Sequence, residues 1–256
     1  MIFRVFFSLL VLIAFISCKP KQDRHKLTVS CAMGLSTVAK ELATAFEHQN
    51  PGATVRFNFA SSGNLAAQIR LGAPADLFMS ASVSIMQRLE KMGLVDGPGA
   101  VTFAANTMVL ITSGNARLTS PRDLVNLNGR LALGNPRSVP AGRYAVESLK
   151  SLGVYRQMKG RIVYGEHVRQ VLDYVLRREV DAGVVYRTDY LLAKDRLRLV
   201  TELPVVTPIH FPAAMVVSTT KKELARRFLS FLLSREARHI LKKAGYSLPK
   251  AVGSAP

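Results

Sequence analysis

Short apolar runs alternate with amphipathic stretches along most of the chain. Residues 27–30 alternate between apolar and polar side chains, which is typical of a strand with one buried face. In the stretch that follows, apolar residues recur at i, i+3 and i+4; they are Leu35, Val38, Ala39, Leu42, Ala43 and Phe46. This spacing predicts an amphipathic helix, and Asn-Pro-Gly at residues 50–52 supplies its stop signal.

The strand-then-helix unit recurs further along the chain. Apolar, β-branched runs predict strands at residues 55–59, 77–80, 107–111, 131–133, 162–164 and 183–186. Helical patterns follow most of them. The last helix is predicted as one long element from about Lys221 to Lys243, ending at Gly245. Repeated units of this kind indicate an α/β fold with largely parallel sheets.

The N-terminal segment has a different character. Its apolar run, over residues 5–16, is too short to span a bilayer and fits the hydrophobic region of a signal peptide. The string Phe-Ile-Ser-Cys that ends the run resembles a lipobox, with Phe15 where Leu is usual. We expect residues 1–18 to be a lipoprotein signal peptide that ends at a lipidated Cys18, and residues 19–26 to be a flexible tether. This predicts a periplasmic or other extracytoplasmic location, anchored to the membrane through Cys18.

Positive charge is in large excess, with 35 Lys and Arg residues against 17 Asp and Glu and a formal net charge of +18. Such a field favours anionic ligands or surfaces but identifies none. Trp is absent, and neither a zinc-finger spacing nor an aromatic RNA-binding signature is present, so we expect no nucleic-acid partner. An envelope protein that binds polyanions or anionic lipid is an alternative, and it predicts an affinity that falls steeply with salt.

The sequence contains no familiar catalytic motif. There is no His-Glu-x-x-His, no P-loop, no Gly-x-Ser-x-Gly and no Gly-x-Gly-x-x-Gly after a strand. The five histidines are scattered without metal-ligand spacing, and Cys31 fits a small buried hydrophobe at a strand end. We therefore expect no enzyme and no cofactor. The alternative is a catalyst on the same fold with Cys31 or His167 as its reactive group.

Small residues gather where four predicted strands lead into helices. These junctions lie at residues 32–34, 61–64, 139–142 and 165–168. Free N–H groups and the positive end of a helix dipole make such a junction attractive to an anion. In open α/β sheets, ligands bind beyond the carboxyl ends of the strands. Any single junction is more often an ordinary N-cap or turn than an anion site, and only the four together favour an anion site.

Four ordered blocks of the sequence resemble the periplasmic molybdate/tungstate-binding proteins of ABC transporters. The blocks are FASSGNLA at residues 59–66, GAPADLFMSA at 72–81, VPAGRYA at 139–145 and GVVYRTD at 183–189. The resemblance implies a periplasmic-binding-protein type II fold, with two α/β lobes joined by two crossovers and a ligand cleft between them. Residues 27–105 and 206–249 would form lobe I, residues 106–205 lobe II, and residues 250–256 a tail.

The resemblance also implies a ligand and its contacts. Proteins of this family capture molybdate or tungstate for the membrane permease of an ABC importer, using neutral hydrogen-bond donors. The implied donors are the N–H groups of Gly34, Ala141 and Val168, the hydroxyl and N–H of Ser62, and the phenol of Tyr186. Gly34 departs from the family pattern, because a serine is usual there, so one hydroxyl donor is missing. Another tetrahedral oxyanion such as sulfate is the alternative ligand.

Two charged residues near the blocks are assigned supporting roles. We expect Asp76 to be a structural carboxylate satisfied by loop N–H groups, because a second anion in the cleft would repel the first. Arg143 is predicted to be an exposed, solvated side chain, and the alternative role is to tune the electrostatic potential of the cleft. The protein as a whole is expected to be a monomer whose lobes close around the ligand by a hinge motion.

Overall fold

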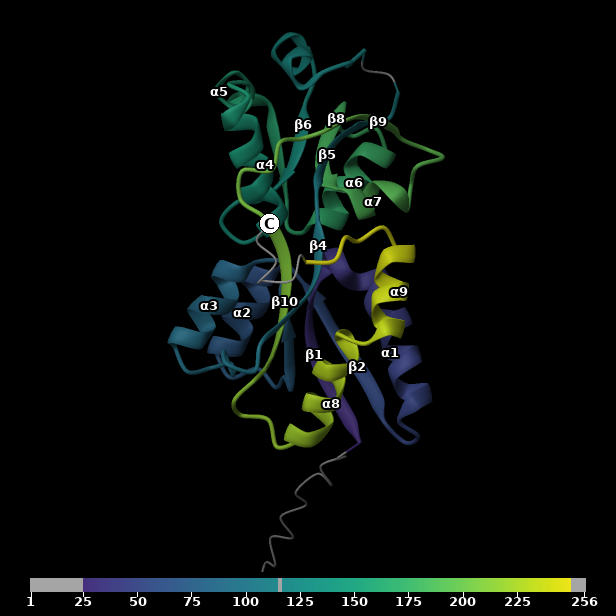
Figure 1. Cartoon of the computed structure of the whole chain (residues 1–256). Helices are drawn as coiled ribbons and strands as arrows, with labels where there is room; N and C mark the ends of the chain where they lie inside the picture. The colour runs from purple at the N-terminus through teal and green to yellow at the C-terminus, as the bar shows by residue number, and fades with distance from the viewer. Residues whose placement is uncertain (1–24, 115–116, 250–256) are drawn as a thin grey trace, which may run out of the picture.

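The computed structural model describes residues 25–114 and 117–249, which form two α/β units, one above the other in Figure 1. The predicted signal peptide, Cys18, nearly all of the tether and the tail lie outside the described residues. Lys26, the last residue of the predicted tether, already pairs with Thr54 in a sheet. Within the described ranges, no helix has the length and apolar character needed to cross a membrane.

Lobe I is built on a five-stranded sheet with the order β2-β1-β3-β10-β4. Its strands are β1 (Lys26–Ala32), β2 (Thr54–Ala60), β3 (Leu77–Met79), β4 (Val101–Asn106) and β10 (Ile209–Met215). Strand β1 is parallel to both of its neighbours, β2 and β3, whereas β10 is antiparallel to both of its own, β3 and β4. One strand of five therefore runs against the rest, which confirms a largely parallel sheet.

Lobe II repeats this plan with the order β7-β6-β8-β5-β9. Its strands are β5 (Met108–Thr112), β6 (Leu131–Gly134), β7 (Ile162–Gly165), β8 (Ala182–Tyr186) and β9 (Arg198–Glu202). Here β5 is the reversed strand, antiparallel to β8 and β9. The chain passes between the sheets twice, from β4 to β5 and from β9 to β10, so the predicted pair of lobes with two crossovers is confirmed. The exact lobe boundaries stay a prediction.

Helices cover both faces of each sheet (Figure 1). Lobe I has α2 (Ser62–Arg70) and α3 (Val83–Lys91) on one face, and α1 (Ser36–Gln49), α8 (Lys222–Leu232) and α9 (Arg235–Lys243) on the other. Lobe II has α4 (Pro140–Ser151), α5 (Tyr155–Met158), α6 (Val168–Leu176) and α7 (Arg187–Leu191). Three short 3-10 helices lie at Met33–Leu35, Pro121–Asn126 and Lys159–Arg161.

The predicted apolar stripe of α1 is fully buried, from Leu35 to Phe46. Phe46 meets Phe228 of α8 edge-on, with ring centroids 5.0 Å apart. Burial of a side chain of this size stabilises a fold by roughly 1.5–3 kcal/mol, so this contact ties α8 firmly to lobe I. A second, smaller core under α2 and α3 is centred on Leu65, Phe78 and Leu89.

The prediction of one long C-terminal helix is wrong. The chain breaks at Leu233, and Ser234 starts α9 by accepting a hydrogen bond from the N–H of Ala237 at 3.1 Å. A serine at this place competes with the helix by capping the next one, and the break turns Ala237 and Leu241 into the core. The end of α9 is as predicted, because Gly245 adopts a φ of +87° that suits glycine.

Candidate functional site

Gly34, Ser62, Ala141, Val168 and Tyr186 all line one pocket at the meeting of the lobes. Lobe I contributes the first two residues and lobe II the other three. The pocket has a volume of about 10 Å³, which is roughly the room that the centre of one water molecule needs. A pocket of this size excludes a sugar or a peptide.

The pocket is surrounded by the starts of helices from both lobes. Ser62 begins α2 after β2, Val168 begins α6 after β7, and Ala141 is the second residue of α4. N–H groups in a first helical turn have no partner inside the helix, and they carry the positive end of its dipole. The small-residue junctions therefore bring uncharged donors together at the carboxyl ends of strands in two different sheets.

The neighbouring residues Ser61 and Ser62, at the start of α2, make different hydrogen bonds. Ser61 is the N-cap, and its side chain accepts a hydrogen bond from the N–H of Asn64 at 3.4 Å. The hydroxyl oxygen of Ser62 accepts from the N–H of Ala81 at 2.9 Å, and Ser62 is buried. Because a hydroxyl can donate as well as accept, this contact fixes the Ser62 oxygen and leaves its hydrogen for a ligand.

The hydroxyl of Tyr186 is a buried polar group at the pocket that lacks a partner within the described part of the chain. The residue is only 1% exposed, yet its hydroxyl has no hydrogen-bond partner among the described residues. Its ring meets Phe211 edge-on at 5.6 Å, which holds the side chain in place. Burial raises the pKa of the Tyr186 phenol well above its ordinary value, so the group stays a neutral donor. A buried polar group without a partner costs about 1–3 kcal/mol, which a ligand that accepts from it would recover.

Gly34 makes room for the Tyr186 ring. A Cβ atom at this position would lie 3.0 Å from Cε2 of Tyr186 and 3.6 Å from Cγ1 of Val168. The Gly34 carbonyl accepts a hydrogen bond from the Tyr246 hydroxyl at 2.5 Å, which fixes the turn from the lobe I side. The glycine therefore does more than omit a hydroxyl, because a larger residue here would press on the ring across the lobe boundary.

His167 and Cys31, which the sequence offered as alternative reactive groups, both have structural roles in the fold. His167 also lines the pocket, and its Nδ1 accepts from the N–H of Gln170 at 3.0 Å as the N-cap of α6. Burial lowers the pKa of His167, which favours the neutral ring. Cys31 is fully buried in β1, and burial raises the pKa of its thiol. No group of three or more metal-ligating side chains occurs among the residues that the structure describes.

Arg143 is not the solvated side chain that was predicted. It extends from α4 of lobe II to lobe I, where it donates to the hydroxyls of Ser82 at 2.7 Å and Ser84 at 3.0 Å. Its side chain is 33% exposed and lies 3.8 Å from Glu147. The serine-rich run after β3 was visible in the sequence. Its contact with Arg143 was not, because the serines and the arginine are about 60 residues apart.

The lobes also touch through their main chains. The N–H of Gly63, in α2 of lobe I, donates to the carbonyl of Ser138 in lobe II at 2.9 Å. A Cβ atom at Gly63 would lie 2.5 Å from that carbonyl oxygen and 2.8 Å from the Ser138 Cα. Only a glycine permits this approach, so Gly63 sets how closely the lobes meet beside the pocket.

Asp76 has the structural role that was predicted, with different partners. Its carboxylate accepts from the N–H of Thr28 at 2.7 Å, the Thr219 hydroxyl at 2.6 Å and the Lys221 ammonium at 3.0 Å. Two of these three donors are side chains, where loop N–H groups were expected. Asp76 does not line the pocket, so its charge is satisfied inside lobe I.

Comparison with known proteins agrees with this geometry. Residues 27–247 match the family model of bacterial extracellular solute-binding proteins, and the chain belongs to this family. YvgL of Bacillus subtilis, named as a candidate substrate-binding lipoprotein of an ABC transporter, is 37% identical over 90% of both chains. The molybdate-binding protein ModA of Haemophilus influenzae is 33% identical over 87% of this chain and 90% of its own.

A solved structure shows the same fold. The periplasmic molybdate-binding protein of Azotobacter vinelandii superposes with a TM-score of 0.79 at 28% identity, covering 88% of this chain and 100% of its own. The architecture is thus the periplasmic-binding-protein type II fold, as the sequence blocks implied.

Proposed function

We propose that this protein captures molybdate or tungstate outside the cytoplasm and delivers it, unchanged, to the membrane permease of an ABC importer. The observation behind the proposal is the buried hydroxyl of Tyr186, which has no hydrogen-bond partner among the described residues, in a residue that lines the pocket together with Ser62 and the starts of α4 and α6. The names of one relative and one structural neighbour, both molybdate-binding proteins, support the ligand class. The name of YvgL, a transporter lipoprotein, supports the role in import.

Uncharged donors suffice for such a ligand because they replace its hydration shell. A dianion moved into a dry pocket loses its water, and each hydrogen bond from protein to a charged group restores roughly 1.5–3 kcal/mol. Donors that the fold already holds in place need no further ordering when the ligand arrives. We infer ligand contacts through Gly34, Ser62, Ala141, Val168 and Tyr186, with no catalytic step and no cofactor.

The proposal includes the way the protein is held at the membrane. Residues 1–18 would be removed up to a lipidated Cys18, and residues 19–26 would tether the anchored end to lobe I. A tethered monomer with lobe I from residues 27–105 and 206–249 and lobe II from residues 106–205 can then close by a hinge at the two crossovers. Only a ligand that contacts both lobes shifts the balance toward the closed form.

Isothermal titration of the purified protein tests the proposal. Molybdate and tungstate should bind with one ion per chain, more tightly than sulfate or phosphate, and should be recovered unchanged. The Ser62→Ala variant should weaken binding about tenfold to a hundredfold, whereas Ser230→Ala, which removes an exposed hydroxyl on α8, should not. Absence of binding by any tetrahedral oxyanion would overturn the proposal, and tighter sulfate binding would move it to the alternative ligand.

A further inference from the structure

A second, larger cavity lies beside the pocket, at the boundary of the lobes. It has a volume of about 200 Å³ and is walled by α2 and α3 of lobe I and by residues 136–140 and α4 of lobe II. Val139 and Pro140 line both this cavity and the inner pocket, so the two are neighbours. We call this second cavity the arginine groove.

Four arginines line the groove, two from each lobe. Arg70 and Arg88 come from α2 and α3, whereas Arg137 and Arg143 come from the loop before α4 and from α4 itself. The groove's lining contains no Asp, Glu or Lys. Arg70, Arg88 and Arg137 are exposed, and the structure gives none of the three an ion pair with a described residue.

Closure of the lobes concentrates this charge. Guanidinium groups that belong to different lobes are brought around one cavity. Salt at physiological strength screens charges only over roughly 8–10 Å, so groups that face one another across a small cavity still repel. Their repulsion opposes the closed form. An anion shared between the two pairs of arginines reverses the sign of this contribution, because it attracts both lobes at once.

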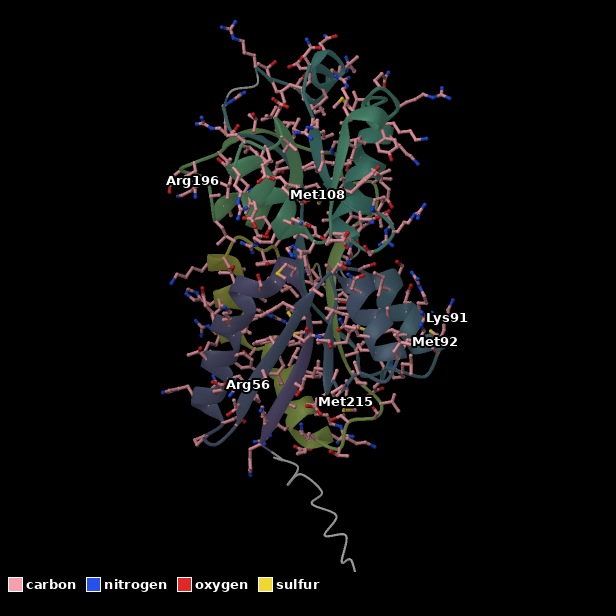
Figure 2. All side chains as sticks on the ribbon, turned by 180° about the vertical axis from the view of Figure 1, so that it is seen from behind. Arg56, Lys91, Met92, Met108, Arg196 and Met215 are labelled. Carbon is pink, nitrogen blue, oxygen red and sulfur yellow. The ribbon has the colours of Figure 1, made fainter. Side chains whose placement is uncertain are left out.

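The size and lining of the groove restrict what fits. Pockets for drug-sized ligands have volumes of about 300–1,000 Å³, so the occupant of this groove is smaller. Ala66, Ile85 and Leu89 give it an apolar floor, and Met92, labelled beside Lys91 at the flank of lobe I in Figure 2, is 49% exposed at its rim. Arg143 already lies beside Glu147, but the other three arginines have no ion pair with a described residue, and they favour an occupant with two or more anionic groups.

We propose that the arginine groove is an accessory site for a small polyanion of the diphosphate or dicarboxylate type, and that its occupancy favours closure of the lobes. The accessory site is inferred from the geometry of the groove alone. Its coupling to closure rests on the proposed function, because a ligand in the inner pocket also bridges the lobes. The polyanion and the pocket ligand would then strengthen each other's binding.

Inorganic pyrophosphate, without divalent cations, is the probe for this site. Calorimetry should show it binding to the unmodified protein and about tenfold or more weakly to the double variant Arg88→Gln/Arg137→Gln. The matched control is Arg56→Gln/Arg196→Gln, which removes one exposed arginine from each lobe at positions outside the groove (Figure 2). This control should bind pyrophosphate as the unmodified protein does.

The coupling is measured by titrating molybdate with and without saturating pyrophosphate. Molybdate should bind several-fold more tightly with pyrophosphate present, in the unmodified protein and the control but not in Arg88→Gln/Arg137→Gln. Equal pyrophosphate affinity in the test and control variants would overturn the accessory site, and competition between the two anions would overturn the coupling. If molybdate failed to bind but pyrophosphate still bound more weakly to the test variant than to the control variant, the proposed function would be wrong and the accessory site would be supported.

Discussion

The inner pocket and the arginine groove share Val139 and Pro140, yet their chemistry is opposite. The pocket is buried and offers hydroxyls and main-chain N–H groups. The groove is open to solvent and offers guanidinium groups. The clustered arginines therefore lie outside the inner pocket, where we propose that the oxyanion binds.

Desolvation explains this division. A charge buried without a partner is costly, so a receptor that must also exist without its ligand benefits from neutral donors in its dry pocket. An exposed arginine costs little, because water and salt screen it, but it still raises the local concentration of anions.

The largest effect is expected for Gly63→Ala. Its new Cβ would collide with the main chain of Ser138, which cannot yield as a flexible side chain would, so the lobes could not close fully. Overpacking of this kind costs about 1–3 kcal/mol, and we expect molybdate affinity to fall up to about a hundredfold. Titration calorimetry measures the loss, and small-angle scattering should show a more open molecule with ligand present.

Gly160→Ala is the matched control, because nothing lies within 4 Å of a Cβ at that position in lobe II. It should bind molybdate normally. Normal affinity in Gly63→Ala as well would show that the close approach of the lobes does not serve the pocket.

Salt should separate the two cavities. Binding of pyrophosphate in the solvent-exposed groove should weaken about tenfold between 50 mM and 500 mM salt, because exposed charges are screened. Molybdate in the desolvated pocket should change by less than about threefold over the same range. Calorimetry at matched pH measures how both affinities depend on salt. A steep salt dependence for molybdate would favour the alternative of an envelope protein that binds polyanions at its surface.

Two substitutions at Gly34 sharpen the description of the pocket. Gly34→Ala should weaken molybdate binding a few-fold, because its Cβ presses on the Tyr186 ring. Gly34→Ser adds a donor to the same Cβ, so it should bind more tightly than Gly34→Ala. The ratio of the two dissociation constants isolates the hydroxyl, and a ratio of one would mean that residue 34 does not donate through its side chain.

The smallest effect concerns Asp189, a buried carboxyl close to Tyr186 in sequence. Burial raises its pKa from 3.8 to about 7, although Arg169 at 3.3 Å opposes the shift. The folded state thus holds a proton that the unfolded state has lost between about pH 4 and pH 7. Stability should fall as pH rises through this window. Thermal unfolding of Asp189→Asn should show a flatter pH dependence, and an unchanged slope would contradict this assignment.

Local patterns in the sequence predicted much of the fold. The stripe of α1 and the junctions before α2, α4 and α6 were readable because they depend on neighbours within a few residues. Strands β4, β9 and β10 were not predicted. In β10, Pro212 interrupts a short apolar run and so conceals the strand pattern. The break at Ser234 was missed because an apolar stripe continues across it.

The parts of the site that could not be predicted are contacts between the lobes. Arg143 meets serines about 60 positions away, and Gly63 meets Ser138, so neither pairing leaves a local pattern. Gly34 is the clearest example. The sequence shows only a missing hydroxyl, whereas the structure shows the Tyr186 ring in the space that a side chain would need.

We propose that the Tyr186 hydroxyl donates a hydrogen bond to the bound ligand, and the Tyr186→Phe variant removes this donor alone. Removal of a buried hydroxyl without a partner should leave the unfolding temperature of the ligand-free protein unchanged or raise it. Molybdate affinity of the same variant should fall about tenfold to a hundredfold. Unchanged affinity, or a fall that is matched by lost stability, would contradict the account.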